Sequence, residues 1–191
     1  MFTRERALEI VREFVKNENL VRHMLAVEAA MRFYARKFGE DEESWAVAAL
    51  LHDFDWEIHP DMDSHPQKGA PLLRERGVPE EIVQHVLSHA DHSSVPRNTL
   101  LRKALYACDD ITGLIVAVAL VRPSRSIHDV KVKSVKKKWK NLQFAAGANR
   151  EEMEKAFTSF GVEPWEHVGN VLEAMQGIAG DLGLEGEPVA E

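Results

Sequence analysis

The sequence predicts an all-α protein that folds as a single compact multi-helix bundle. Apolar residues recur at steps of three and four along almost the whole chain, which is the periodicity of a helix with one buried face. No stretch of four or more residues alternates apolar and polar types between turn signals, as a strand would. The chain has 191 residues, 45% hydrophobic and 29% charged, which is ordinary for a globular domain with a core of its own.

The N-terminal part is predicted to form five helices. Thr3 is a suitable N-cap for the first, and Gly39 follows the second as a residue type that commonly ends helices in the left-handed conformation. Pro79 opens the fifth helix, where its missing amide hydrogen costs nothing. These helices are expected at residues 3–16, 20–38, 42–51 and 65–76, and from residue 79 onward.

The C-terminal part is predicted to begin with a central helix at 99–121, because this segment is apolar nearly all round except at Asp109 and Asp110. Three further helices are expected at 127–142, 149–160 and 164–182. We therefore expect one domain over 1–182, with a core at about 19–120, C-terminal helices over 126–182 and a flexible tail at 183–191. An apolar surface on the last helix is compatible with a homodimer.

Composition excludes several classes of function. The formal charge of −7 argues against general binding to polyanions, so nucleic acid is not an expected partner. The longest nearly uncharged run, 111–121, is too short to cross a bilayer, so no membrane partner is expected. A signal peptide is not evident, and the single cysteine, Cys108, cannot form an internal disulfide. These features predict a soluble, cytoplasmic protein.

Histidines and aspartates are the residues that indicate chemistry. His23 lies inside a predicted helix, the pair His52 and Asp53 ends another, and Asp109 interrupts the apolar central helix. Imidazole nitrogen and carboxylate oxygen are ligands for divalent metals. A single helical histidine is more often structural, but an aspartate in an apolar helix is costly unless it is paired or bound to a cation. Because Arg102 and Lys103 sit poorly on the helix to pair with Asp109, the combined pattern favours a metal site.

The order of these residues resembles a known family. His23, then His52-Asp53 within the segment AALLHD, then Asp109 within ACD, is similar to the H…HD…D signature of the HD-domain superfamily of metal-dependent phosphohydrolases, over roughly residues 19–120. The segments HPQKG at 65–69 and LSHAD at 87–91 are similar to those that supply further histidines in the HDIG and HD-GYP branches. No GYP motif follows, and the doublet continues as FDW, so the chain most resembles the stand-alone HDIG-like hydrolases.

The resemblance implies an HD-domain-like bundle with one or two divalent ions, which would be manganese, iron, cobalt, nickel, zinc or magnesium. It implies a first metal held by one set of ligands and a second metal, bridged by Asp53, held by two more histidines. The first set is His23, His52, Asp53 and Asp109, and the additional histidines are His65 and His89. Position alone leaves His85 and His92 as competitors of His89. The remaining histidines, His59, His128 and His167, have no partners at ligand spacing and are expected to be exposed.

The implied activity is hydrolysis of a small phosphomonoester or phosphodiester, such as a nucleotide, through metal-activated water. Asp53 would be catalytic as the bridging ligand. Asp55 or Asp110 would exchange a proton, or would instead support a ligand from behind or lie at the surface. Lys68 is expected to face the same cleft and bind phosphate, or to be solvated. The lysine-rich segment 131–140 is a solvated helix face or a funnel for phosphate or nucleic acid. Two alternatives stay open, which are a di-iron oxygenase of the same fold and a non-catalytic nucleotide-binding regulatory module.

Overall fold

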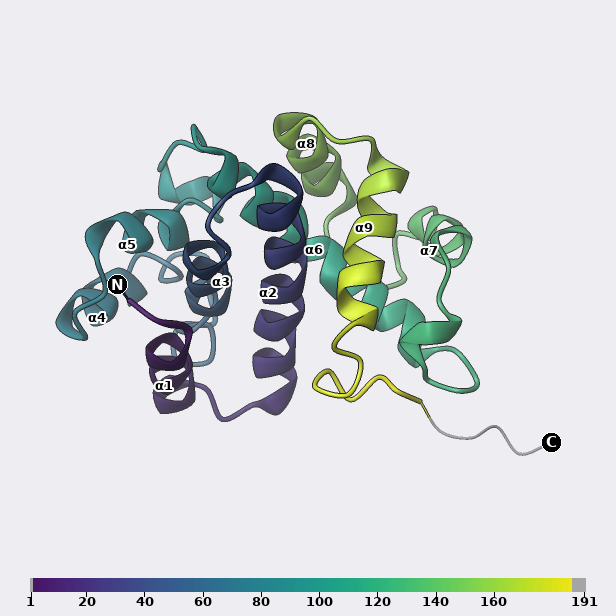
Figure 1. Ribbon diagram of the computed structural model, residues 1–191, viewed down its shortest axis with the longest axis horizontal. Coiled ribbons are helices and arrows are strands. Elements are labelled where there is room, and N and C mark those ends of the chain that lie inside the picture. The colour runs from purple at the N-terminus through teal and green to yellow at the C-terminus, as the bar shows by residue number, and fades with distance from the viewer. Residues whose placement is uncertain (1, 187–191) are drawn as a thin grey trace.

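The computed structural model describes residues 2–186, and its regular secondary structure within that range is helical throughout. This confirms the predicted all-α class. The elements, shown in Figure 1, are α1 (Arg4–Phe14), α2 (Glu18–Phe38), α3 (Glu42–Leu51), α4 (Gly69–Glu75), α5 (Glu80–Leu87), η1 (Asp91–Ser93), α6 (Leu100–Leu120), η2 (Ile127–Asp129), α7 (Val132–Trp139), α8 (Arg150–Phe160) and α9 (Pro164–Gln176).

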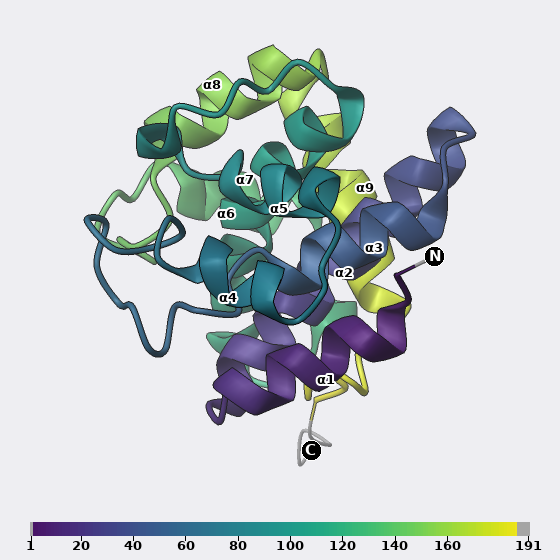
Figure 2. The same ribbon diagram turned by 90° about the vertical axis from the view of Figure 1, so that its left-hand side faces the viewer.

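Helix α2 runs through the middle of the molecule and separates two hydrophobic clusters. Figure 1 shows α1, α3, α4 and α5 on one side of α2, and α7, α8 and α9 on the other. The first cluster joins α1 to α3 and α5, and the second joins α2 to α6, α8 and α9. Figure 2 shows α1 and α8 at opposite ends of the molecule, with α4 and α5 between them. The two longest helices, α2 and α6, pack against each other, and each contributes to the candidate site.

Helix α3 directs the segment that carries the histidine–aspartate pair into the interior. The Asp41 side chain accepts a hydrogen bond from the Ser44 amide and so caps the start of the helix. Every residue from Trp45 to Leu51 is buried, because this helix is covered on all sides by α1, α2 and α5. The helix therefore ends inside the protein, where His52 follows it.

Two predicted helices begin later than expected, and the second also ends earlier. Helix α4 begins at Gly69 and not at residue 65, because the preceding segment forms turns. The Asp61 side chain accepts a hydrogen bond from the Asp63 amide, and Pro66 has no amide hydrogen to donate to a helical hydrogen bond. The helix expected at 127–142 is confined to α7, because Ser126 instead caps the short η2 turn. His65 consequently lies in a loop.

The first residues of the predicted flexible tail are packed against the fold. Helix α9 ends at Gln176 and not at residue 182, and the chain then folds back so that the buried Leu184 accepts a hydrogen bond from the Ile127 amide at 2.8 Å. Residues 183–186 therefore pack against the segment before α7 and are not a tail. The rest of the predicted tail, 187–191, lies outside the described residues.

The predicted apolar surface on the last helix is absent from the described part of α9. Its large hydrophobic side chains face the core, and the large apolar residues that the structure does expose lie elsewhere, at Phe38, Ile58, Met62, Leu120, Val121 and Leu142. The apolar surface that supported the prediction of a homodimer is therefore not found on this helix. Among the helices of residues 2–186, none has both the length and the apolar character needed to span a bilayer.

Candidate metal centre

Six side chains from five segments meet between α2, α3 and α6. Helix α2 supplies His23, and His52 and Asp53 directly follow α3. His65 comes from the loop before α4, and His89 lies just beyond α5. Asp109 projects from the middle of α6. These are the six residues that the resemblance implies as ligands, and the structure brings all of them together in two groups of three.

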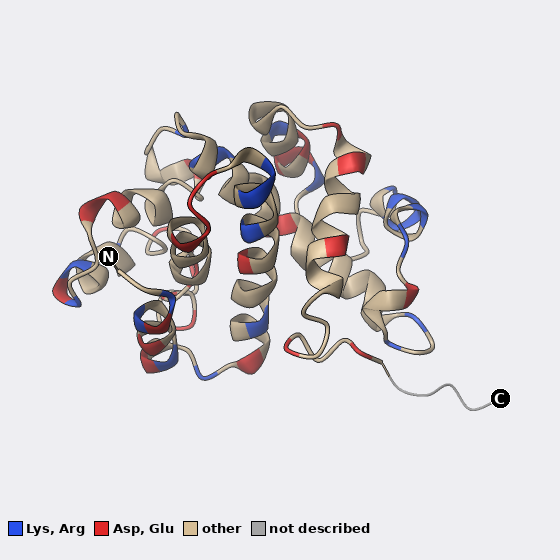
Figure 3. Ribbon diagram, in the orientation of Figure 1, with Lys and Arg blue, Asp and Glu red and all other residues tan. Residues whose placement is uncertain are grey.

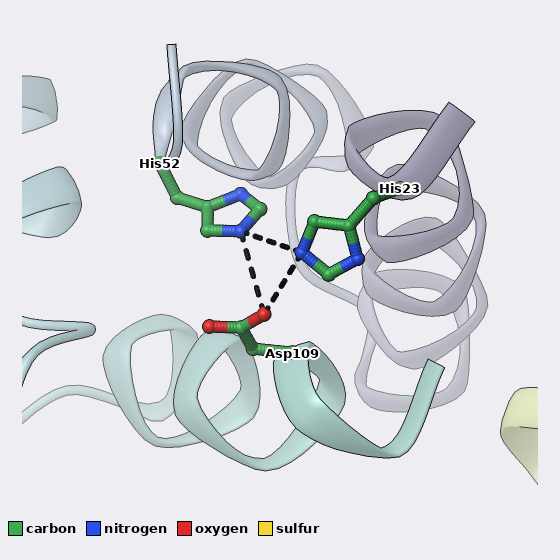
Figure 4. A group of neighbouring side chains, drawn as sticks. All are labelled: His23, His52 and Asp109. Atoms are coloured by element: carbon green, nitrogen blue, oxygen red, sulfur yellow. Dashed lines mark hydrogen bonds and ion pairs between the residues drawn. The ribbon is translucent and has the colours of Figure 1, made fainter. Parts of the chain in front are cut away.

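The first group joins His23, His52 and Asp109, which point toward one another from three different helical segments (Figure 4). The His23 Nε2 atom lies 3.0 Å from Asp109 Oδ1 and 3.2 Å from His52 Nε2. The His52 Nε2 atom lies 3.5 Å from the same carboxylate oxygen. Three potential ligand atoms therefore surround one point, as a shared cation requires.

The second group joins Asp53, His65 and His89, and Asp53 links it to the first. The Nε2 atoms of His65 and His89 are 2.9 Å apart, and they lie 3.3 and 3.4 Å from Asp53 Oδ1. The other carboxylate oxygen, Asp53 Oδ2, lies 3.6 Å from His23 Nε2 and 3.5 Å from His52 Nε2. Each oxygen of this carboxylate thus faces a different group, which is the arrangement of a bridging ligand.

Hydrogen bonds on the far side of three rings set which nitrogen faces the centre. His52 Nδ1 donates to the Ala49 carbonyl at 2.7 Å, and His89 Nδ1 donates to the Val86 carbonyl at 2.5 Å. His65 Nδ1 donates to Asp55 Oδ1 at 2.8 Å. Because Nδ1 carries the proton in each neutral ring, Nε2 presents its lone pair to the centre, which is the orientation that metal-ligating histidines require.

The carboxylates make these histidines unusually basic. Burial lowers the pKa of His52, but the charges of Asp53 and Asp109 together outweigh that effect and raise it to about 10. Burial also opposes the charge on His65, yet its hydrogen bonds with Asp53 and Asp55 raise its pKa to about 9. Burial raises the pKa of Asp53, but the His52 charge and the hydrogen bonds from His65 and His89 hold it well below its usual range. The electrostatic environment of the two groups therefore stabilises positive charge.

The residues fit one or two divalent ions. With Nδ1 protonated, the Nε2 atoms of His52 and His65 each direct a lone pair at the Nε2 atom of a second histidine, at 3.2 and 2.9 Å. While the rings are neutral, two such lone pairs repel, so each pair of nitrogens needs a proton or a bound cation between them. Four imidazole nitrogens and two carboxylates also form the mixed nitrogen and oxygen donor set that borderline divalent metals prefer.

The two groups form the floor of a cleft of about 640 Å³. Trp56 and Met62 come from the loop after α3, whereas Tyr106 and Asp110 lie on α6 beside Asp109. The opposite wall is the segment from Ala145 to Met153, which includes Glu152 at the start of α8. A cleft of this size holds a small molecule against the ligand atoms.

Two residues predicted to act on the substrate do not reach this cleft. Asp55 is completely buried behind His65, and it contacts the ring nitrogen that faces away from the centre. Lys68 turns back along its own loop, where its Nζ atom donates to Ser64 Oγ at 2.8 Å. Neither residue lines the cleft. Asp110 does line it, and burial, followed by the charges of Asp109 and Glu152, raises its pKa to about 7.

The structure separates the competing histidines from the centre. His85 accepts a hydrogen bond from Arg102 Nε at 3.1 Å and lines a different pocket. His92 donates from Nε2 to the backbone carbonyl of His65 at 2.6 Å. The family resemblance, which favoured His89 over these two, agrees with this geometry.

One histidine expected to be exposed is instead fully buried. His167 accepts a hydrogen bond from the Tyr34 hydroxyl at 2.5 Å and donates to the Ala107 carbonyl at 2.9 Å. Burial is the main cause that lowers the pKa of His167 to about 4. Its position four residues before the buried Val171 was a signal for this, because such residues share a helix face.

The lysine-rich segment lies apart from the cleft. Figure 3 places the basic residues of α7 at the edge of the molecule farthest from α4 and α5. Lys133, Lys136 and Lys137 are exposed there, and none of the lysines in 131–140 lines the cleft. In the described part of the chain this segment is a solvated helix face, as its periodicity suggested.

Comparison with known proteins supports the assignment at the level of the family. Neither a curated protein nor a solved structure matches the chain. The model of the HD domain family matches residues 20–119, which is more than half of the chain and includes all six residues of the two groups. The chain belongs to the HD domain family.

Proposed function

We propose that the protein is a metal-dependent phosphohydrolase that hydrolyses a small phosphomonoester or phosphodiester. The HD superfamily is one of metal-dependent phosphohydrolases, and membership supports this chemistry. The observation that carries the proposal is the position of Asp53, whose two oxygens face two different groups of histidines on the floor of a cleft. An arrangement that shares one carboxylate between two ion sites suits phosphoester hydrolysis.

The chain's own residues have separate tasks in this proposal. His23, His52, Asp53 and Asp109 would hold one divalent ion, and His65 and His89 would hold a second together with Asp53. Bound ions would supply hydroxide near neutral pH and neutralise charge on the phosphoryl oxygens. Asp55 is a positioning residue, because it fixes the His65 ring through the nitrogen that faces away from the centre. Trp56 and Met62 line the cleft beside the two groups and would contact the substrate.

Metal analysis beside a substrate screen tests the proposal. We would measure bound metal in the purified protein and in Asp53→Asn, and assay both against a broad set of phosphoesters with manganese, iron, cobalt, nickel, zinc and magnesium. The variant is expected to lose most of its metal and its hydrolytic activity together. Asp181→Asn is a matched control, because Asp181 is exposed and far along the chain from the site. Turnover retained by Asp53→Asn would contradict the proposal.

The same experiment separates the two alternatives. A set of four histidines and two carboxylates also suits a pair of iron ions. Iron as the resident metal, a mixed-valent spectrum and oxygen consumption in place of phosphate release would support the oxygenase. Tight binding of a phosphorylated ligand without turnover under any of the metals would support the regulatory module.

A further inference from the structure

The cleft lacks the basic side chains that usually surround a phosphorylated substrate. Of the described residues that line it, none is lysine or arginine. Three carboxylates that belong to neither ligand group line it instead, at Asp91, Asp110 and Glu152. This composition is unexpected for a site that would bind several phosphates, because such sites use lysine or arginine to neutralise them.

One of the three carboxylates is neutralised by the protein. Asp91 pairs with Arg97 through an ion pair of 2.6 Å, and it also accepts a hydrogen bond from the Tyr106 hydroxyl. Arg97 lies over the Tyr106 ring, outside the residues that line the cleft. Asp91 is therefore a fixed part of the wall and has no charge left to attract a ligand.

The other two carboxylates, Asp110 and Glu152, have no such partner. Both line the cleft, and neither forms an ion pair within the described residues. The side-chain partner of Glu152 is the uncharged Asn149, whose Nδ2 atom donates to it at 3.0 Å. Asp110 and Glu152 thus line the cleft beside a centre that attracts cations. No lysine or arginine among the described lining residues balances their charge.

The arginine nearest to them in sequence is directed elsewhere. Arg150 is almost fully buried, and its guanidinium donates to the carbonyl groups of Phe144, Ala145 and Ala148. It therefore holds the shape of the wall from behind and does not line the cleft. Among the described residues that line the cleft, no lysine or arginine is available to pair with a second anionic group of a ligand.

Charge balance limits what the loaded site would accept. Two divalent ions would carry four positive charges, of which Asp53 and Asp109 remove two. The remaining positive charge would be used by the attacking hydroxide and by one phosphoryl group. A second phosphate or a carboxylate on the substrate would then meet Asp110 and Glu152 without compensation, whereas an ammonium group would be attracted to them. Met62, Tyr106 and Met153 offer apolar contact for the carbon atoms between the two ends.

We propose that this cleft selects phosphomonoesters whose distal end carries an amine, with Glu152 and Asp110 as the residues that recognise the ammonium group. This substrate class rests on the proposed phosphohydrolase function. It disfavours nucleoside di- and triphosphates, whose additional negative charges have no partner in the cleft.

A matched series of substrates tests the proposal. 2-Aminoethyl phosphate, 2-hydroxyethyl phosphate and phosphoglycolate have chains of the same length and differ in the charge of the distal group. 4-Aminobutyl phosphate and 4-hydroxybutyl phosphate repeat the comparison with a longer carbon chain. With the metal-loaded protein we expect kcat/KM to be at least tenfold higher for one of the amines than for its hydroxyl counterpart, and lowest for phosphoglycolate.

Variants test whether Glu152 in the cleft wall causes the preference for the amine. In Glu152→Gln the advantage of the amine over the hydroxyl compound should fall about tenfold, chiefly through KM, while the amide keeps an acceptor for Asn149. Glu154→Gln is the matched control on the same helix, because Glu154 is exposed and does not line the cleft. Its preference should equal that of the natural sequence. A preference that is unchanged in Glu152→Gln would overturn the proposal.

A binding measurement separates failure of this inference from failure of the proposed function. 3-Aminopropylphosphonate and butylphosphonate have no ester bond to cleave, so calorimetry on the metal-loaded protein reports recognition alone. Tighter binding of the amine, lost in Glu152→Gln, would support the inference even if no phosphoester were hydrolysed. Equal hydrolysis of amine and hydroxyl compounds in both the short and the long pair would overturn it and leave the phosphohydrolase intact. Loss of a bound metal ion in Glu152→Gln would also overturn it, because the carboxylates would then hold a metal.

Discussion

Replacing Gly69 by alanine should disable one of the two ligand groups and spare the other. Gly69 begins α4 and lies against the carboxylate of Asp55. A Cβ atom at this position would come within 2.4 Å of Asp55 Oδ2 and 2.5 Å of its Cγ atom. Because Asp55 is completely buried, it has no open space to move into, and its 2.8 Å hydrogen bond with His65 must break or lengthen.

The size of the effect follows from two costs. Forcing an extra methyl group into a packed interior typically costs about 1–3 kcal/mol of folding free energy. Loss of the hydrogen-bond partner behind a metal-ligating histidine typically lowers metal affinity about 10- to 100-fold, which is about 1.4–2.7 kcal/mol. Since Asp55 supports His65 alone among the six residues, this loss should fall on the group with Asp53 and His89.

Metal titration followed by calorimetry, together with thermal unfolding, measures both costs. We expect Gly69→Ala to unfold at a lower temperature and to bind one ion with nearly natural affinity and the other 10- to 100-fold more weakly. Gly113→Ala is the control, since a Cβ atom on that helical glycine meets nothing within 4 Å and should stabilise α6 slightly. Two ions bound with natural affinity and an unchanged unfolding temperature in Gly69→Ala would refute the reasoning.

Three further predictions concern protonation and burial. Because the pKa values of about 10 for His52 and about 9 for His65 keep both protonated in the metal-free protein at pH 7, metal must displace protons, and its affinity should fall at least tenfold per unit as pH decreases. Titrations at pH 6, 7 and 8 check this, and a constant affinity would contradict it. His167 has a pKa of about 4 when folded and about 6.5 when unfolded, so the unfolded state binds more protons between these values and stability is lost as pH falls through them. In urea unfolding, the free energy of unfolding should fall by about 2 kcal/mol between pH 7 and pH 5 because of this residue. His167→Gln should remove that part of the pH dependence. Burial raises the pKa of the Cys108 thiol, so a maleimide should label it only as fast as the protein unfolds, and rapid labelling of the native state would disprove its burial.

The parts of the site that could be predicted are those with local signals. Helical periodicity located α2, α3 and α6, and the order of His23, the doublet and Asp109 along them matched a family signature. The position of Lys68 depends on how the loop before α4 turns, which periodicity does not report. The cleft wall around Glu152 was missed for a related reason, because its segment is distant in sequence and meets the centre only through the packing of α8 on α6.

His65 is oriented differently from His52 and His89, and this difference explains the role of Asp55. His52 and His89 each follow a helix, so each finds a carbonyl group three residues earlier that has no partner within the helix. His65 lies in a loop with no helix before it, and it uses the carboxylate of Asp55 instead. That carboxylate fits only because residue 69 has no side chain. The aspartate two positions after the doublet and the glycine four positions after His65 therefore act as one support, and of the roles expected for Asp55 the geometry favours support of His65 over proton transfer.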